Sequence, residues 1–360
     1  MKCFDVARNR SSNIELLRCI CMFLIIYLHI LIHGVNGEFA RFNNQDVLPT
    51  TLLESFSSIF CMVAVNVFVI ISGYFGIKVL EDKSTIKIQK VLKNYWIILF
   101  YSVTISVIFF LMRKISVIDF ILSFFPVITV KWWFATCYMG LVIMSPFLNL
   151  IVEKNWNNLY LYVVLFFISL STYLFEGSDF CNVLGFKSLG FSTILICYIL
   201  GRCIFFLYEN NVVLVKKKSS IYFLFYVSCC VVSFLGTLFL FILTKKNYWF
   251  RVSTYVSPVT LFGSIFLFLT FLNLKMKKSN MINLFGNTTF GIYLIHENPR
   301  IRPVLYGIID AVKFKESGFI YLFIYLLFIC ICVFLFCSFI DFIRNLLFEL
   351  FGIILYRKKK

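Results

Sequence analysis

Residues 14–35 read IELLRCICMFLIIYLHILIHGV, and this stretch decides the fold class. It is almost wholly apolar and long enough to cross the roughly 30 Å of hydrocarbon in a bilayer as one helix. It nevertheless carries Glu15, Arg18 and His29. Ionisable groups are costly in lipid, so within such a helix they normally face a protein interior or a wet cavity. We therefore interpret the stretch as a membrane helix with a functional face.

Similar apolar runs recur along the whole chain. The 360 residues are 61% hydrophobic and only 14% charged, with a mean hydropathy of +0.92, values far from those of a soluble domain. The runs predict an all-α polytopic membrane protein, a single membrane domain over residues 1–360. We expect about ten transmembrane helices, at residues 14–35, 56–77, 95–112, 132–152, 159–175, 189–207, 221–243, 254–273, 286–297 with a continuation toward 312, and 318–348.

The basic residues indicate the orientation of these helices. The net charge is +17, and most of the 34 lysines and arginines fall at alternate ends of the predicted spans. The positive-inside rule then places both termini in the cytoplasm, with Lys358, Lys359 and Lys360 in the last segment. Because the charge lies in short loops rather than on one folded face, we expect a lipid bilayer and no nucleic acid as partner.

Arg18 and His29 are eleven positions apart, which is about 16 Å of rise and close to three turns of an α-helix, so they share a face. An ion pair with Glu15, three positions before Arg18, is the structural alternative. His33 follows His29 by four positions, but no third ligand accompanies them on this helix, and we expect no metal. His296, the third histidine of the chain, could approach His29 or mark the membrane interface.

Other polar residues within or beside the apolar runs are weaker signals. Ser72 and Tyr74 end the second span, where small residues also suit ordinary helix packing. A lysine-rich stretch that includes Lys90 and Lys93 follows, suited to phosphates or to anionic lipid headgroups. The fourth span begins at an interfacial pair of tryptophans and contains polar positions; its candidate residues are Trp133, Tyr138 and Asn149.

Together these segments resemble the bacterial membrane acyltransferase-3 family, which includes polysaccharide and lipopolysaccharide O-acetyltransferases. The resemblance spans nearly the whole chain, and the matching pieces occur in the family's order. They are Asn13 to Arg18 with Tyr27-Leu28-His29, Asn66 to Tyr74, Trp132 to Asn149, and Phe290 to His296. Family members tend to carry an arginine pair after the second helix, and the counterparts here are Lys90 and Lys93, which lack the bidentate guanidinium.

The resemblance implies acyl transfer from a cytoplasmic acyl-CoA, usually acetyl-CoA, to a hydroxyl of a carbohydrate or lipid-linked glycan at the bacterial cytoplasmic membrane. His29 would be the general base, with Arg18 and Glu15 completing the catalytic set. Arg18 would also bind the donor, and the other residues divide into two groups: Ser72, Tyr74, Lys90 and Lys93 for the donor, and Trp133, Tyr138, Asn149 and His296 for the acceptor.

Two other functions remain open from the sequence. A transporter or flippase for a glycan also has many spans and intramembrane charges, but it would not consume acyl-CoA. An assembly partner of envelope enzymes would leave Arg18 and His29 without a role. The residues indicate neither the acceptor sugar, nor the acyl group, nor direct transfer as against an acyl-histidine intermediate, nor the oligomeric state.

Overall fold

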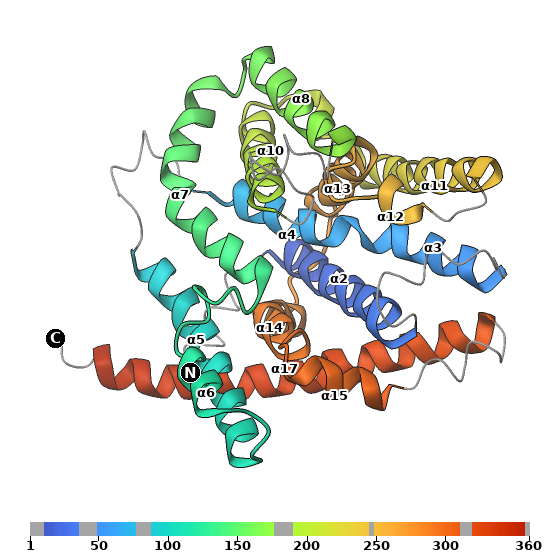
Figure 1. Ribbon diagram of the computed structural model, residues 1–360. Helices are drawn as coiled ribbons and strands as arrows, with labels where there is room; N and C mark the ends of the chain where they lie inside the picture. Colours follow the sequence, from blue (N-terminus) through green and yellow to red (C-terminus); the bar gives the residue numbers. More distant parts are fainter. Residues whose placement is uncertain are drawn as a thin grey trace. The chain divides into compact units, whose positions relative to one another are not determined.

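The computed structural model describes residues 11–35, 49–76, 88–175, 190–244, 248–309 and 319–356, and every regular element in these ranges is a helix (Figure 1). Seven helical stretches are long and apolar enough to cross a membrane: Ser12–Gly34, Ser55–Tyr74, Val91–Leu111, Trp133–Asn155, Phe191–Glu209, Ser219–Thr244 and Ile320–Leu350. Two shorter apolar helices are Leu159–Phe175 and Pro258–Leu272. The prediction of an all-helical chain with several helices long and apolar enough to span a membrane is confirmed, while ten crossings and their orientation stay predictions.

Several apolar helices expose most of their side chains. An 18-residue stretch of Ser219–Thr244 has a mean hydropathy of 2.3, yet only 17% of it is buried. An 18-residue stretch of Ile320–Leu350 has a mean hydropathy of 3.0 and is 28% buried. Apolar surfaces of this extent are rare on soluble monomers, because water disfavours them. Their exposure suits contact with lipid.

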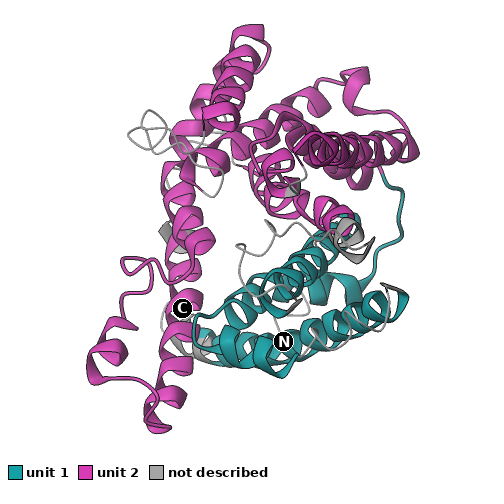
Figure 2. Cartoon of the chain, turned by 45° about the vertical axis from the view of Figure 1, so that its right-hand side comes forward, with its two compact units in different colours: residues 1–37, 274–360 teal, residues 38–273 magenta. Residues whose placement is uncertain are grey.

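The helices group into two compact units, residues 1–37 with 274–360 and residues 38–273 (Figure 2). The first unit therefore joins the two ends of the chain. Its described helices are α2 (Ser12–His29), the π-helical segment η1 (Ile30–Val35), α14 (Asn280–His296), α15 (Ile301–Ile308) and α17 (Phe319–Tyr356).

Helices α2 and α14 run parallel and in register. At their starts, the Ser279 backbone N–H donates to Ser12 Oγ at 2.8 Å, and Ser279 caps α14 through the Ile282 N–H. At their ends, His29 lies against His296. Both contacts join residues 267 positions apart, so the register is kept over the full length of the two helices. The common direction is that expected of a first and a ninth span in an alternating topology.

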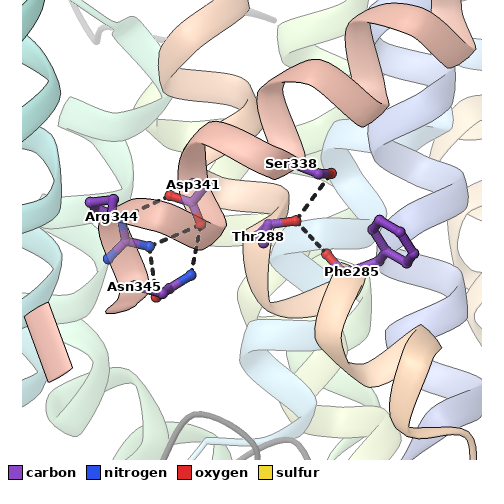
Figure 3. Close-up of polar contacts among 6 residues, drawn as sticks. All are labelled: Phe285, Thr288, Ser338, Asp341, Arg344 and Asn345. Atoms are coloured by element: carbon purple, nitrogen blue, oxygen red, sulfur yellow. Dashed lines mark hydrogen bonds and ion pairs between the residues drawn. The ribbon is translucent and has the colours of Figure 1, made fainter. Parts of the chain in front are cut away.

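Helix α17 crosses α14 at a glycine. A Cβ on Gly291 would collide with the Asp341 carboxylate, so the absence of a side chain there allows the close approach. Asp341 forms a bidentate ion pair with Arg344, at 2.8 and 2.9 Å, and accepts a further bond from Asn345 (Figure 3). One turn of α17 earlier, Thr288 Oγ1 donates to Ser338 Oγ at 3.3 Å.

The second unit is built around α4 (Val63–Tyr74), which packs against α10 (Phe191–Glu209) and α13 (Pro258–Leu272). Outside this core, α7 (Trp133–Asn155) packs on α10, and α11 (Ser219–Thr244) packs on α13. The remaining elements are α3 (Pro49–Cys61), α5 (Ile88–Leu111), α6 (Val117–Leu122), α8 (Leu159–Phe175), η3 (Val213–Val215) and α12 (Trp249–Val252).

Most predicted spans overlap an observed helix with shifted ends, and two differ in more than their ends. The span at 56–77 is interrupted at Met62, which separates α3 from α4, and α3 already begins at Pro49, a residue suited to a first helical position. The span at 286–297 was predicted to begin too late and to continue too far, toward 312. Helix α14 begins at Asn280, because Ser279 caps it, and it ends at His296 rather than continuing toward 312. A separate helix, α15, follows.

Candidate functional site

His29 is the last residue of α2 and lies beside the last residue of α14. Its Nδ1 is 3.2 Å from His296 Nε2, and the two ring centroids are 5.4 Å apart. The parallel register of α2 and α14 produces this meeting. The side chain of His29 is 19% exposed, whereas His296 is fully buried. The alternative in which His296 approaches His29 is therefore the one observed.

The hydrogen bonds assign the protons of the two neutral rings. His296 Nδ1 lies 2.7 Å from the Ile292 carbonyl, which can only accept, so His296 Nδ1 carries the proton and its Nε2 is an acceptor. His29 Nδ1 must then be the donor in the bond to His296 Nε2. The remaining nitrogen, His29 Nε2, therefore carries a lone pair.

Glu297, directly after α14, places a carboxylate beside this histidine pair. Its Oε1 lies 3.1 Å from His29 Nδ1, and its Oε2 lies 3.4 Å from Arg302 Nη1. Oε1 is buried and makes no hydrogen bond of good geometry. A negative charge at this position stabilises positive charge on the His29 ring, as in a carboxylate–histidine pair.

The π-helical turn after His29 brings a second histidine to the same end of α2. His33 Nε2 lies 4.0 Å from Glu297 Oε1, and its ring is 5.3 Å from the Tyr306 ring of α15. π-helical turns within α-helices are frequent at functional sites. The residues His29, His296 and Glu297 are called the histidine cluster below, and His33 lies beside it.

Arg18 lies near the other end of α2, eleven residues before His29. Its Nε is 3.7 Å from Glu15 Oε1, a loose ion pair, and the two side chains are 29% and 7% exposed. The local pairing offered as the structural alternative is therefore present. It does not satisfy Arg18 fully, because the buried Nε has no hydrogen-bond partner. The Glu15 carboxylate rests on Gly286 of α14, where a Cβ would collide with it.

In the second unit, α4 and α10 cross with their backbones in contact. A Cβ on Gly73 would collide with the Tyr198 carbonyl, and one on Gly201 would collide with the Ile70 carbonyl. Gly73, between Ser72 and Tyr74, therefore serves ordinary helix packing, as the alternative interpretation of this segment expected.

Polar side chains surround this crossing. Ser72 Oγ and the Tyr138 hydroxyl are 3.3 Å apart, and the Tyr198 hydroxyl donates to Asn149 Oδ1 at 2.8 Å. Residues assigned separately to donor and acceptor binding, Ser72 and Tyr138, thus lie in direct contact.

Arg202, one turn after Tyr198 on α10, is fully buried in the same region. Its Nη1 donates to the Gly76 carbonyl at 3.0 Å. Its guanidinium also lies over the rings of Phe205 and Phe206, at 4.5 and 4.8 Å. A buried cation beside polar side chains can hold an anionic group or fix the fold of the α4 end.

The other predicted residues are more dispersed. Tyr74 lies among aromatic rings, 5.3 Å from Phe268 and 5.6 Å from Phe205. The Trp133 ring is 6.4 Å from that of Tyr255. Lys93 is exposed near the start of α5, and the side chain of Lys90 lies outside the described residues.

Sequence reasoning missed the charged residues at the ends of three apolar runs. They are Glu297, Arg202 and the pair Asp341 and Arg344. The signal was present, since each lies within or directly after a predicted span, and the rule that selected Arg18 applies equally to them. Only their contacts distinguish Glu297, which lies against His29, from Asp341, which pairs with Arg344 of its own helix.

Comparison with known proteins identifies the class of the chain. The family described as "Acyltransferase domain", of the acyltransferase 3 type, matches residues 11–340. No curated protein and no solved structure matches the chain. The match includes both units and every helix discussed above except the end of α17. The chain therefore belongs to the acyltransferase 3 family and is an acyltransferase.

Proposed function

We propose that this acyltransferase moves an acyl group, acetyl from cytoplasmic acetyl-CoA, to a hydroxyl of a cell-surface or lipid-linked polysaccharide at the bacterial cytoplasmic membrane. The observation that carries the proposal is the proton assignment in the histidine cluster. His29 Nδ1 is held as a donor by His296, so His29 Nε2 carries the lone pair that a general base needs.

The chemical step follows from this arrangement. A hydroxyl is a poor nucleophile until its proton is removed, so His29 Nε2 takes that proton as the oxygen attacks the thioester carbonyl. The imidazolium that forms is stabilised by Glu297, 3.1 Å from Nδ1. The C–S bond then breaks, and the proton passes from His29 to the departing CoA thiolate. An acyl-His29 intermediate would use the same nitrogen in two successive transfers.

His296 serves this base as a positioning residue rather than as an acceptor ligand. It is fully buried, and both its ring nitrogens are engaged, by His29 and by the Ile292 carbonyl. A ring in this state has no nitrogen left for a sugar hydroxyl. Its role is to fix the tautomer and the direction of His29.

Arg18 is the residue we assign to the acyl donor. A cytoplasmic N-terminus places it near the inner end of α2, on the side where acyl-CoA is found, and about 16 Å of helix separates it from His29. Its incomplete pairing with Glu15 leaves donors for a phosphate. The long pantetheine arm of CoA would then extend along α2 toward His29.

The polar residues of the second unit are further candidates for substrate contacts. Ser72, Tyr74, Lys90 and Lys93 are proposed for the donor, and Trp133, Tyr138 and Asn149 for the acceptor. The contact between Ser72 and Tyr138 favours one shared polar region over two separate ones. Arg202 joins this set as a buried cation beside Gly76.

The test is acylation of the surface polysaccharide in cells that express His29→Ala or Arg18→Ala at wild-type levels, with mass spectrometry of the glycan as the readout. We expect loss of one acyl mass in both variants. His33→Ala is the matched control, because it removes an imidazole one turn away and should retain acylation. Full acylation by His29→Ala would refute the proposal, and release of free CoA by the purified protein with acceptor would exclude transport alone.

A further inference from the structure

The three ligand-type atoms at the centre of the histidine cluster converge on one point. His29 Nδ1 lies 3.2 Å from His296 Nε2 and 3.1 Å from Glu297 Oε1, and the three residues each offer one ligand atom within 4.8 Å of the other two. Two imidazoles and one carboxylate are the ligand set of many zinc sites. With metal–ligand distances of about 2.0–2.1 Å, ligands of a tetrahedral ion are about 3.3 Å apart. The two separations from His29 Nδ1, 3.2 and 3.1 Å, are close to that value.

The surroundings of these atoms are also those of a metal site. His296 directs its Nδ1 to the Ile292 carbonyl, which orients Nε2 toward the centre, as outer hydrogen bonds do for metal-bound histidines. Glu297 Oε2 is held by Arg302, while Oε1 is buried without a hydrogen bond of good geometry. A buried carboxylate oxygen in this state is stabilised strongly by a cation.

We propose that His29, His296 and Glu297 form a binding site for Zn²⁺ or a similar divalent transition metal, and that the bound metal inhibits acyl transfer. The expectation of no metal rested on the lack of a third ligand on the first helix. The parallel packing of α14 on α2 supplies the missing ligands from a segment 267 positions away.

Inhibition follows from the tautomer of His29, and this part of the inference rests on the proposed function. A metal at His29 Nδ1 uses the lone pair of that nitrogen, so the single proton of the neutral ring moves to Nε2. The lone pair that would take the acceptor's proton is then lost. Metal binding and general-base action at His29 are therefore mutually exclusive, and no proton is released from the ring in the exchange.

Access to the site is possible from the end of α2. The side chains of His29 and His33 are 19% and 27% exposed, whereas His296 is buried. In the predicted topology this end of the helix faces outward. The fourth position on the metal would then be open to water.

The experiment measures metal binding to the purified full-length protein in detergent, without donor or acceptor. Co²⁺ is titrated and followed by its visible absorption, and Zn²⁺ affinity is obtained by competition. We expect one equivalent, a spectrum without thiolate-to-cobalt charge transfer, and about 100-fold or greater weakening in Glu297→Gln and in His296→Gln. His33→Gln is the matched control and should stay within a few-fold of the wild type.

Glu297→Gln keeps the proposal testable if His296→Gln does not fold, because Glu297 lies outside the helix and is partly exposed. Absence of tight binding, thiolate bands, or equal affinity in the wild type and Glu297→Gln would overturn the metal site whatever the outcome for acyl transfer. With binding established, Zn²⁺ should abolish CoA release by the wild type, and a chelator should restore it. Binding without inhibition would instead refute the role of His29 as base.

Discussion

Two acid–arginine pairs flank α14, and they differ in how fully they are hydrogen-bonded and buried. The fully hydrogen-bonded, buried pair is called the closed pair below, and the other the open pair. Glu15 and Arg18 on α2 are three residues apart, as are Asp341 and Arg344 on α17, and each carboxylate rests on a glycine of α14. The α17 pair is bidentate, at 2.8 and 2.9 Å, with side chains 4% and 0% exposed. The α2 pair has one contact of 3.7 Å, with Arg18 29% exposed.

The difference fits a structural role for the α17 pair and agrees with our proposal that Arg18 binds the acyl donor. Arg344 is further held by Asn345 at 2.9 Å and lies 5.0 Å from the Phe348 ring centroid, so its donors are directed to α17 itself. Arg18 Nε has no hydrogen-bond partner although it is buried. Because an unsatisfied buried donor is costly, a ligand that accepts from Arg18 gains the energy that Arg344 already obtains within the fold. The same spacing on two helices thus gives one pair that is fully hydrogen-bonded and one that leaves a buried donor unsatisfied.

The largest expected effect is on the closed pair. Asp341→Ala should lower the free energy of unfolding by about 3–5 kcal/mol, since it leaves the Arg344 charge buried without its carboxylate. Denaturant or thermal unfolding in detergent micelles measures the loss. The double variant Asp341→Leu/Arg344→Leu should recover most of it, because both charges are removed. A loss under about 1 kcal/mol would show that the pair behaves as a surface pair.

Arg18→Ala should lower activity strongly while changing stability little, the reverse of Asp341→Ala. We expect kcat/KM for the acyl donor to fall about 100-fold, about 2.7 kcal/mol in transition-state stabilisation, as on removal of one charged or hydrogen-bonding donor. Stability should change by less than about 1 kcal/mol. The measurement is CoA release against donor concentration, with unfolding of the same preparation beside it. If Arg18→Ala lowered stability but left kcat/KM for the donor unchanged, the Glu15–Arg18 pair would be structural, like the Asp341–Arg344 pair.

Gly291→Ala tests the contact between the Asp341 carboxylate and the glycine of α14. The added Cβ would collide with Asp341, and overpacking of this kind should cost about 1–3 kcal/mol of unfolding free energy. Gly307→Ala is the control, because nothing lies within 4 Å of a Cβ there, and its effect should stay within about 0.5 kcal/mol. Equal effects of the two substitutions would mean that α17 does not approach α14 at Gly291.

The smallest effect is expected from Glu15→Gln. The amide keeps the shape of the side chain on Gly286 and weakens the loose pairing with Arg18, so stability should change by less than about 1 kcal/mol. The KM for the donor should change by a few-fold, because Glu15 orients Arg18 without satisfying it. The free energy of unfolding and the KM for the donor are measured for Glu15→Gln and for Asp341→Asn, and the two variants are compared. A loss from Glu15→Gln as large as that from Asp341→Asn would end the distinction.

The sequence was most informative where one segment suffices. Helices follow from apolar runs, and the predicted span at 159–175 coincides with Leu159–Phe175. The shared face of Arg18 and His29 follows from helical geometry alone, since α2 is continuous from Ser12 to His29. Where a cap or a break intervenes, as at Ser279 and Met62, the predicted bounds were wrong, because hydropathy does not register a single hydrogen bond or turn.

The sequence by itself therefore determined the helical class, the apolar spans and the ionisable residues on the first helix, since these depend on local composition and on the period of a helix. The tertiary structure alone decided that His296 and Glu297 meet His29, that Ser72 meets Tyr138, and that one acid–arginine pair is closed and the other open. Those outcomes depend on which residues of distant helices come into contact. The parallel register of α2 and α14 and the glycines at helix crossings determine such contacts. A pattern within a single segment contains no information about either.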